Sequence, residues 1–421
     1  MRILGRIVAA ALVAAAALPS LGLAQSRNVG PGVADRTNTL TRGGGDEIIF
    51  GGEVQTTLEL DINGRRRGHS DAHGNLFTES LLAGYLLLPH GFAVNGVARL
   101  EQTDRAADGR GSVFRDQTLW VDELYLTWSR GVLDVFGGKI HPRFGSAWDR
   151  GPGLYGTDFG REYELTEKLG AGARVWLTDL LGMTRMIGAH NLQAEFFQSD
   201  RSLLSSGLIN PRWAQTRTVT DPDTGEATAR TVFRWRNRRG TGGADNGDFL
   251  GGTVLSLAGY GIPMPRGQAG YTLSWSARRP GEDAVAEGRA ATEHGVTAGA
   301  FWTIPLPWRM VGAPFVEYAR LDQAGGVRDR RSDWWTAGFD LRRAPWTASY
   351  AFLQNGNEDR APGGERGTRV QQTASLTYDL YFVAPLPILR TASVTLGWRR
   401  LREAGVASND FGGLLGWAWK F

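Results

Sequence analysis

The segment Glu47–Asn63, EIIFGGEVQTTLELDIN, alternates apolar and polar residues with a period of two. Its even-numbered positions, from Ile48 to Ile62, are mostly apolar, and its odd-numbered positions are mostly acidic or polar. This alternation indicates a β-strand with one apolar face and one polar face. Because the run of about 15 residues is roughly twice the length of a common sandwich strand, we expect one face to meet an apolar medium and the other to meet water.

The same alternation recurs along the chain. It is found in 161–177 (REYELTEKLGAGARVWL), where Tyr163 and Leu165 fall on the apolar face, and in 369–383 (RVQQTASLTYDLYFV). The final segment, 409–421 (NDFGGLLGWAWKF), places Trp417, Trp419 and Phe421 on one face. A soluble β protein would leave these three large aromatic side chains in water. The pattern therefore favours strands that contact lipid.

Short and long connections alternate between the strands. Short turns with Pro or Gly occur at 88–91, 129–131, 178–185, 261–267, 305–310, 343–346 and 384–390. Longer polar segments occur near 63–75, 104–116, 141–160, 199–248, 280–292, 322–331, 355–367 and 403–409. Seven turns and eight loops predict sixteen strands, with both chain termini on the short-turn side, the periplasm. Within strand 117–130 the pattern is irregular around Asp122, which suggests a β-bulge.

These features predict an all-β fold, a transmembrane antiparallel β-barrel. Hydrocarbon cannot satisfy backbone N–H and C=O groups, so a sheet in a membrane has to close on itself. A barrel of about sixteen strands leaves an aqueous lumen. We expect the barrel over residues 47–421, with short periplasmic turns and long extracellular loops.

The N-terminus has the features of a secretory signal peptide. Arg2 and Arg6 precede a short apolar run that ends at Ala24. A membrane anchor is the alternative, but Pro19 interrupts the run, which is short for a membrane-spanning helix. We expect 1–24 to be a cleaved signal and 25–46 to be a flexible periplasmic segment. That segment is too short for the plug domain of a TonB-dependent transporter.

Composition narrows the function further. The chain has no cysteine, which excludes disulfides and thiolate metal sites. Its formal net charge is +4, or +2 without Arg2 and Arg6, too balanced to indicate a nucleic-acid partner. Fifteen Trp and 58 Gly suit a large β protein with tight turns and aromatic belts.

The residues show no convincing catalytic or metal site, and we expect no cofactor and no enzymatic activity. His69, Asp71 and His73 could form a weak metal site, but an ordinary polar loop explains them better because no HExxH motif or closing ligand follows. There is no GxSxG motif. The loop 199–248 is rich in arginine and could capture an anionic ligand or lipopolysaccharide phosphates. Its acidic residues balance this charge, which favours a solvated extracellular loop.

The period-two aromatic end at Trp417, Trp419 and Phe421 resembles the terminal assembly signal of bacterial outer-membrane proteins. The whole predicted barrel resembles the sixteen-stranded porins of Gram-negative bacteria. This resemblance implies an outer-membrane location, contact with lipid and lipopolysaccharide, recognition by the barrel-assembly machinery, and a homotrimer. In porins the third extracellular loop folds inward and narrows the pore. Here that loop is 141–160, although its sequence, HPRFGSAWDRGPGLYG, lacks the acidic signature usual in the family.

The residues of this loop suit an inward fold. Its glycines and prolines permit sharp reversals, and its aromatic residues could anchor it against the wall; an outward loop packed on the rim is the alternative. We predict a mixed-sign constriction formed by Arg143, Asp149, Arg150 and Asp158. The facing pore wall is expected to consist of Arg99, Glu101, Lys139, Glu162, Glu164, Lys168, Arg174, Arg278, Arg342, Arg369 and Arg399.

The resulting hypothesis is a passive channel for small hydrophilic solutes. The excess of arginine over acids among the wall positions suggests a slight preference for anions. Three alternatives remain open at this stage. The first is a substrate-specific channel for an oligosaccharide, a siderophore or an exported polymer, and the others are a barrel enzyme and a barrel that anchors the envelope.

Overall fold

The computed structural model describes residues 48–63, 73–102, 112–114, 117–205, 207–208, 213–220, 227–234, 244, 250–280, 285, 288–386 and 389–421. The predicted signal peptide (1–24) and periplasmic segment (25–46) lie outside these residues, as do His69 and Asp71. No helix in the described part of the chain is long and apolar enough to cross a membrane.

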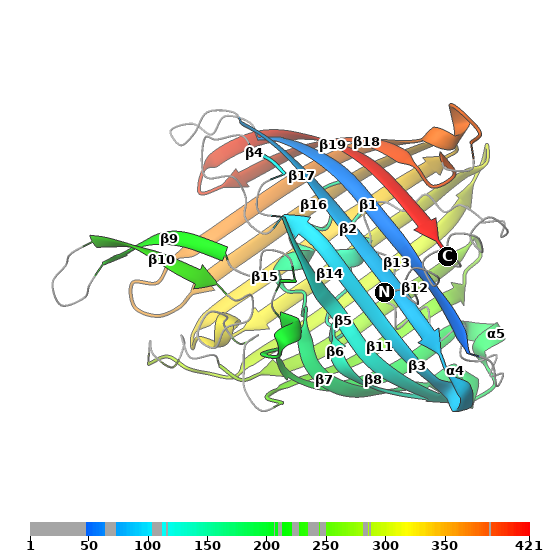
Figure 1. Ribbon diagram of the computed structural model, residues 1–421, viewed down its shortest axis with the longest axis horizontal. Coiled ribbons are helices and arrows are strands. Elements are labelled where there is room, and N and C mark those ends of the chain that lie inside the picture. Colours follow the sequence, from blue (N-terminus) through cyan, green and yellow to red (C-terminus); the bar gives the residue numbers. More distant parts are fainter. Residues whose placement is uncertain are drawn as a thin grey trace, which may run out of the picture.

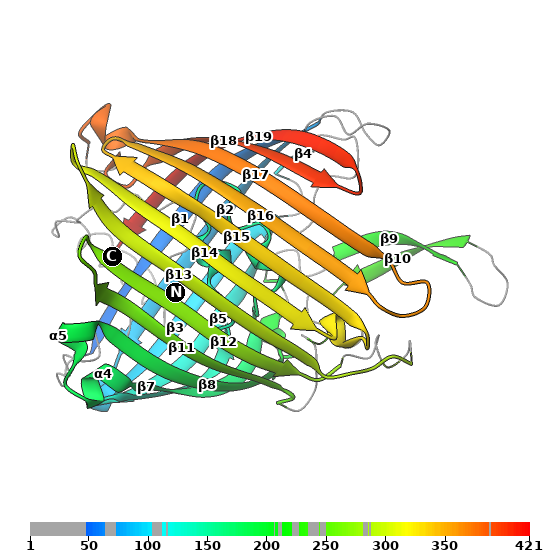
Figure 2. The same cartoon turned by 180° about the vertical axis from the view of Figure 1, so that it is seen from behind.

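Sixteen antiparallel strands form one closed sheet, because the last strand pairs with the first (Figures 1 and 2). The predicted barrel and its strand number are confirmed. The strands are β1 (Ile49–Asn63), β2 (His73–Leu87), β3 (Phe92–Gln102), β5 (Gln117–Arg130), β6 (Leu133–Ile140), β7 (Lys168–Trp176), β8 (Ala189–Ser199), β11 (Gly252–Pro263), β12 (Gln268–Arg278), β13 (Glu293–Leu306), β14 (Met310–Asp322), β15 (Arg330–Arg343), β16 (Trp346–Asp359), β17 (Arg366–Asp379), β18 (Ser393–Glu403) and β19 (Val406–Lys420).

Three further strands lie outside this set. Strand β4 (Ser112–Val113) pairs with β2, while β9 (Trp213–Thr220) and β10 (Ala227–Arg234) form a hairpin within the long loop after β8. This hairpin was not predicted. It projects from one end of the barrel, and α4 and α5 lie at the other end (Figures 1 and 2). The helical turns are η1 (Pro89–Gly91), α3 (Ala147–Arg150), η2 (Gly160–Glu162), α4 (Leu177–Leu180), α5 (Thr184–Ile187), η3 (Leu203–Ser205), η5 (Ala324–Gly326) and η6 (Leu380–Phe382).

The two faces of β1 have the environments that its sequence pattern predicts. Leu58, Leu60 and Ile62 are exposed on the outside of the barrel, while Glu53 and Glu59 are buried on the inside. In a membrane the exposed aliphatic face meets hydrocarbon and the inner face meets the polar lumen. The outside of the barrel is thus suited to lipid.

The irregularity expected near Asp122 is a β-bulge. Val97 of β3 pairs with Glu123, and Ala98 pairs with Val121, so Asp122 is the extra residue of β5. A bulge redirects neighbouring side chains. Asp122 and Glu123 are both buried and both contact His141, the first residue after β6.

The main apolar cluster lies inside the barrel, where the segment between β6 and β7 packs on the wall. From this segment the cluster contains Phe144, Phe159, Tyr163 and Leu165, and from β15 it contains Trp334. A sheet closed around an aqueous lumen cannot fill its interior with its own side chains alone. The segment 141–167, which we call the β6–β7 loop, supplies that packing.

Candidate functional site

The β6–β7 loop reaches strands on the far side of the barrel. At its far point the Tyr155 hydroxyl donates to Asp61 Oδ1 of β1 at 2.9 Å, and the Gln371 side chain of β17 donates to the Tyr155 carbonyl at 3.1 Å. Asp158 pairs with Arg399 of β18 at 3.0 Å. The loop that connects β6 to β7 is therefore held against β17, β18 and β1.

Glycines in the wall make room for this far point. Gly397 of β18 and Gly412 of β19 face each other across the ladder. A Cβ atom at Gly412 would lie 2.1 Å from the Tyr155 hydroxyl, and one at Gly397 would lie 2.7 Å from a methyl group of Leu154. Any larger side chain at either position would displace the loop.

Glu317 of β14 anchors the middle of the loop. Its buried carboxylate accepts hydrogen bonds from the Ser146 N–H at 2.7 Å, the Ala147 N–H at 2.9 Å and the Tyr163 hydroxyl at 2.6 Å. Burial and the neighbouring Glu317 charge raise the pKa of Tyr163, so its hydroxyl keeps the proton that it donates. One wall carboxylate thus holds two parts of the loop that are 17 residues apart in sequence.

The four predicted constriction residues fall into two places. Arg143, Asp149 and Arg150 line one cavity of about 90 Å³ between the first half of the loop and strands β5 to β8, β11 and β12. Asp158 lies on the other side of the loop, where it contacts Arg399 and Gln371. The cavity is also lined by wall groups of both signs and by aromatic rings: Glu123, Tyr125, Phe136, His141, Trp148, Arg174, Glu195 and Tyr260.

Arg150 differs from the other cations of this cavity. Its guanidinium lies 4.0 Å from the ring centre of Phe301 and 6.0 Å from that of Tyr260, a cation–π arrangement. Within the described part of the chain it forms no ion pair. Arg143, in contrast, donates to Asn191 at 3.0 Å. The Arg150 guanidinium therefore contacts aromatic rings and no carboxylate within the described part of the chain.

Most of the predicted wall cations are paired with carboxylates. Arg99 contacts Asp122 at 2.8 Å, Glu79 at 3.3 Å and Glu101 at 3.7 Å, and Arg342 contacts Asp340 at 2.8 Å. The remaining pairs are Lys139 with Glu167 and Asp200, Arg278 with Glu293, Arg369 with Glu162, and Arg399 with Asp158 and Asp410. Arg174 hydrogen-bonds Gln193 at 2.6 Å, and Lys168 is buried at the start of β7. The arginine excess on the wall is therefore largely neutralised.

The strand predicted over 161–177 begins later than expected, at Lys168. Glu162 and Glu164 were predicted to lie on this strand, and that placement is wrong, because both belong to the loop; their role in the pore wall stays a prediction. Tyr163 and Leu165 were predicted to face lipid, yet they are buried inside the barrel against Phe144 and Trp334. Packing on the interior cluster, not strand pairing, sets the conformation of 161–167.

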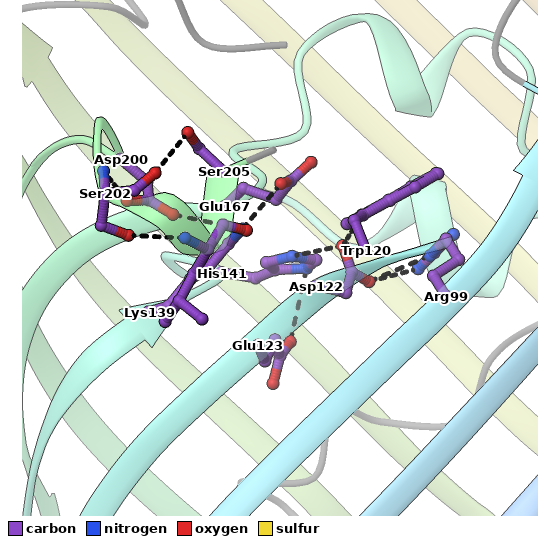
Figure 3. Close-up of polar contacts among 11 residues, drawn as sticks. Arg99, Trp120, Asp122, Glu123, Lys139, His141, Glu167, Asp200, Ser202 and Ser205 are labelled. Atoms are coloured by element: carbon purple, nitrogen blue, oxygen red, sulfur yellow. Dashed lines mark hydrogen bonds and ion pairs between the residues drawn. The ribbon is translucent and has the colours of Figure 1, made fainter. Parts of the chain in front are cut away.

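His141 was not predicted to be a site residue, although it contacts two acids of the bulged strand (Figure 3). Its ring nitrogens lie 3.3 Å from Asp122 and 3.4 Å from Glu123. Burial lowers the pKa of His141, but the Asp122 and Glu123 carboxylates outweigh burial and raise the pKa to about 9. The histidine is therefore a cation at neutral pH. The irregular pattern at Asp122 was the available sequence signal for this site. It does not identify His141 as the partner, because His141 belongs to a different segment of the chain.

Lys139 forms a second ionic cluster at the base of the loop (Figure 3). Its buried ammonium contacts Glu167 at 2.8 Å, Asp200 at 3.2 Å and the Leu204 carbonyl at 2.9 Å. Lys139 is the next-to-last residue of β6 and Glu167 directly precedes β7, so the pair joins the two ends of the loop. It has a structural role and does not line the cavity.

The predicted assembly-signal residues lie at the end of β19. Trp417 and Trp419 belong to this strand, and Phe421 follows it. Phe421 exchanges two backbone hydrogen bonds of 3.0 Å with Gly52 of β1. Its ring lies 5.7 Å from Phe50 and 5.9 Å from Trp419. These residues therefore contribute to the seam that closes the barrel.

Comparison with known proteins identifies the fold. No protein-family model matches the chain, and the search of curated proteins found no match. Among solved structures, the high-pH structure of OprB from Pseudomonas putida superposes with a TM-score of 0.55 at 11% identity, covering 95% of this chain and 99% of that one. OccK9 (OpdG) of Pseudomonas aeruginosa gives 0.48 at 10% identity, covering 89% and 99%. A loop L8 deletion mutant of OmpT, an outer membrane protein of Vibrio cholerae, gives 0.48 at 9% identity, covering 89% and 99%. Sixteen strands, a closed seam and an apolar outer face agree with this likeness, and the chain has the fold of the outer-membrane β-barrel channels of Gram-negative bacteria.

Proposed function

We propose that this protein is a passive outer-membrane channel for small hydrophilic solutes, with the β6–β7 loop as its constriction. The observation that carries the proposal is the set of contacts that hold this loop against β14, β17, β18 and β1. A loop held against these strands closes that part of the lumen. Solutes are left with the part of the lumen on the opposite side of the loop. That space includes the cavity lined by Arg143, Asp149 and Arg150.

The charge of this cavity favours anionic solutes. Four cationic side chains, His141, Arg143, Arg150 and Arg174, face three acidic ones, Glu123, Asp149 and Glu195. Arg150 has no carboxylate partner in the described part of the chain, so its field acts on the solute. In a narrow, partly desolvated passage, such a charge selects ions with little screening. The preference thus rests on Arg150 and not on the number of wall arginines.

Planar bilayer recordings test this proposal. Under a tenfold KCl gradient, we expect the reversal potential of the wild-type channel to show chloride preferred over potassium. Arg150→Gln should reduce the permeability ratio severalfold, because it removes the unpaired charge and keeps a polar side chain. Arg331→Gln is the control, since Arg331 pairs with Asp333 on the outer face of β15. Cation preference in the wild type, or an unchanged ratio in Arg150→Gln, would contradict the anion assignment.

A substrate-specific channel is the second candidate. The rings of Tyr125, Phe136, Trp148 and Tyr260 line the same cavity as Arg150, and such rings can stack on sugar faces. Current recordings with a neutral oligosaccharide and with a sugar acid distinguish the two functions. Saturable block by one of them at millimolar concentration favours a specific channel, whereas linear behaviour with both favours a general one.

The trimer implied by the resemblance to porins remains a prediction. Light scattering of the detergent complex gives its mass directly.

A further inference from the structure

The outer face of β18 changes character toward its end at Glu403. Leu396, Trp398, Arg400 and Arg402 alternate with residues that face the lumen, because Arg399 between them contacts Asp158 inside the barrel. Leu396, Arg400 and Arg402 are exposed, and Trp398 is half-buried. Along this face the order is aliphatic, aromatic, cationic and cationic.

The neighbouring strands add no negative charge at these positions. In register with Arg400 stand Gln372 of β17 and Asn409 of β19, and in register with Arg402 stand Val370 and Ala407. The three strands run side by side at the top of the barrel in Figure 1. Within the described residues, neither Arg400 nor Arg402 forms an ion pair. Two like charges thus sit on one face without a counter-charge from the strands beside them.

Other outward arginines near the same end of the barrel do have partners. Arg320 contacts Asp322 at 2.7 Å, Arg331 contacts Asp333 at 2.7 Å, and Arg366 contacts Glu358. These pairs stand on β14 to β17. The unpaired Arg400 and Arg402 of β18 therefore differ from these three arginines of β14 to β17.

The aromatic level of this face locates the membrane boundary. Trp398 is in register with Phe411 of β19, and aromatic residues of outer-membrane barrels mark the interface between hydrocarbon and headgroups. Same-face residues of a strand are about 7 Å apart. Arg400 and Arg402 therefore stand one and two steps beyond that boundary, on the side of the long loops, at the depth of lipid phosphates.

We propose that Arg400 and Arg402 form a binding site for the phosphate groups of a lipid headgroup in the outer leaflet. Guanidinium groups bind phosphate through paired, charge-assisted hydrogen bonds. Gln372 and Asn409 supply amide groups beside Arg400 for the polar atoms of the same headgroup. Trp398 and Leu396 present the apolar surface on which the acyl chains of that lipid lie. The site is on the outside of the barrel, so it does not depend on the proposed channel activity.

Lipid binding to the purified barrel tests the site. Diphosphorylated lipid A and its dephosphorylated form are titrated against wild-type protein in detergent, and retention is measured by native mass spectrometry. We expect the diphosphorylated lipid to bind at least tenfold more tightly. Arg400→Gln/Arg402→Gln should remove most of this difference. Arg343→Gln should keep it, because Arg343 is exposed at the opposite end of the barrel.

Several outcomes would overturn the proposal. Equal binding of the two lipids by wild type, or unchanged discrimination in the double variant, removes the role of the two arginines. If millimolar inorganic phosphate competes as strongly as lipid does, the site binds free phosphate and not a lipid headgroup. Concentration-dependent association that the double variant abolishes shows a contact between copies of the chain. Conductance, measured in parallel, should be unchanged by the double variant.

Discussion

His141 places a cation among three acids, of which Asp122 and Glu123 are buried and Glu164 is half-buried. Asp122 and Glu123 come from β5 and Glu164 comes from the end of the β6–β7 loop, while Arg99 of β3 balances part of their charge. Removing one partner of a buried charged cluster leaves the others uncompensated and destabilises the fold. The protonation state of His141 therefore controls the stability of this part of the barrel.

This linkage predicts a loss of stability at alkaline pH. The folded-state pKa of about 9 is above the usual value near 6.5, so the stabilisation is complete below about pH 6.5 and is lost as pH rises through 9. The shift corresponds to roughly 3 kcal/mol. We expect urea unfolding in lipid vesicles to show a drop of that order between pH 6 and pH 10. His141→Gln should lack the drop, and Asp122→Asn should reduce it. An equal drop in wild type and His141→Gln would refute the linkage.

The β6–β7 loop depends on Glu317 as its main polar anchor. Glu317→Gln keeps the shape of the side chain, but its NH2 replaces one of the two oxygens and so faces the N–H of either Ser146 or Ala147, which bond to different oxygens. A buried donor left without an acceptor costs about 1–3 kcal/mol. We expect the loop to leave the wall part of the time, seen as higher and noisier single-channel conductance. The barrel itself should remain folded.

Glu53→Gln is the matched control for this variant. Glu53 is also a buried inward carboxylate, but it stands on β1, where it contacts Gln55 and Lys420. Its substitution should leave conductance and noise unchanged. Identical recordings from wild type and Glu317→Gln would show that Glu317 does not hold the constriction.

The strands were predictable from the sequence because one physical rule governs them all. Lipid on one side and water on the other impose the alternation seen from Ile48 to Ile62, and tight turns such as 343–346 end the strands. The same rule fails over 161–167. Tyr163 and Leu165 keep the alternation, but their apolar side chains meet the interior cluster. A period of two shows that the two faces of a segment differ in polarity. It does not show what each face contacts.

The candidate site was predictable only in part. Charge and turn residues pointed to Arg143, Asp149 and Arg150, which do share a cavity. Asp158 is separated from them because Arg399 and Gln371 hold it at the opposite wall. The contacts of Glu317 with the loop, and those of His141 with β5, depend on which strands the loop crosses. That information is absent from any single segment and arises when the barrel closes.

For the whole molecule, closure depends on the seam between β1 and β19. Ten residue pairs join these strands, from Glu53 with Lys420 to Ile62 with Phe411. Closure leaves no strand edge in the membrane, where an unpaired backbone group costs several kcal/mol. Phe421 extends the seam by its two backbone hydrogen bonds to Gly52. Two roles for this residue are therefore distinguishable, stability of the seam and recognition by the barrel-assembly machinery.

Phe421→Ala separates these roles, because it keeps the backbone hydrogen bonds and removes the ring contacts with Phe50 and Trp419. We expect refolding into lipid vesicles to proceed, with a loss of about 1 kcal/mol from the missing aromatic contacts. In cells, folded protein in the outer membrane should fall severalfold, since the predicted assembly signal is damaged. Trp335→Ala is the control: it removes an exposed ring 4.7 Å from that of Tyr318, away from the seam. Equal outer-membrane levels of both variants would contradict the role of Phe421 in the assembly signal. Phe421 would then act only in the stability of the seam.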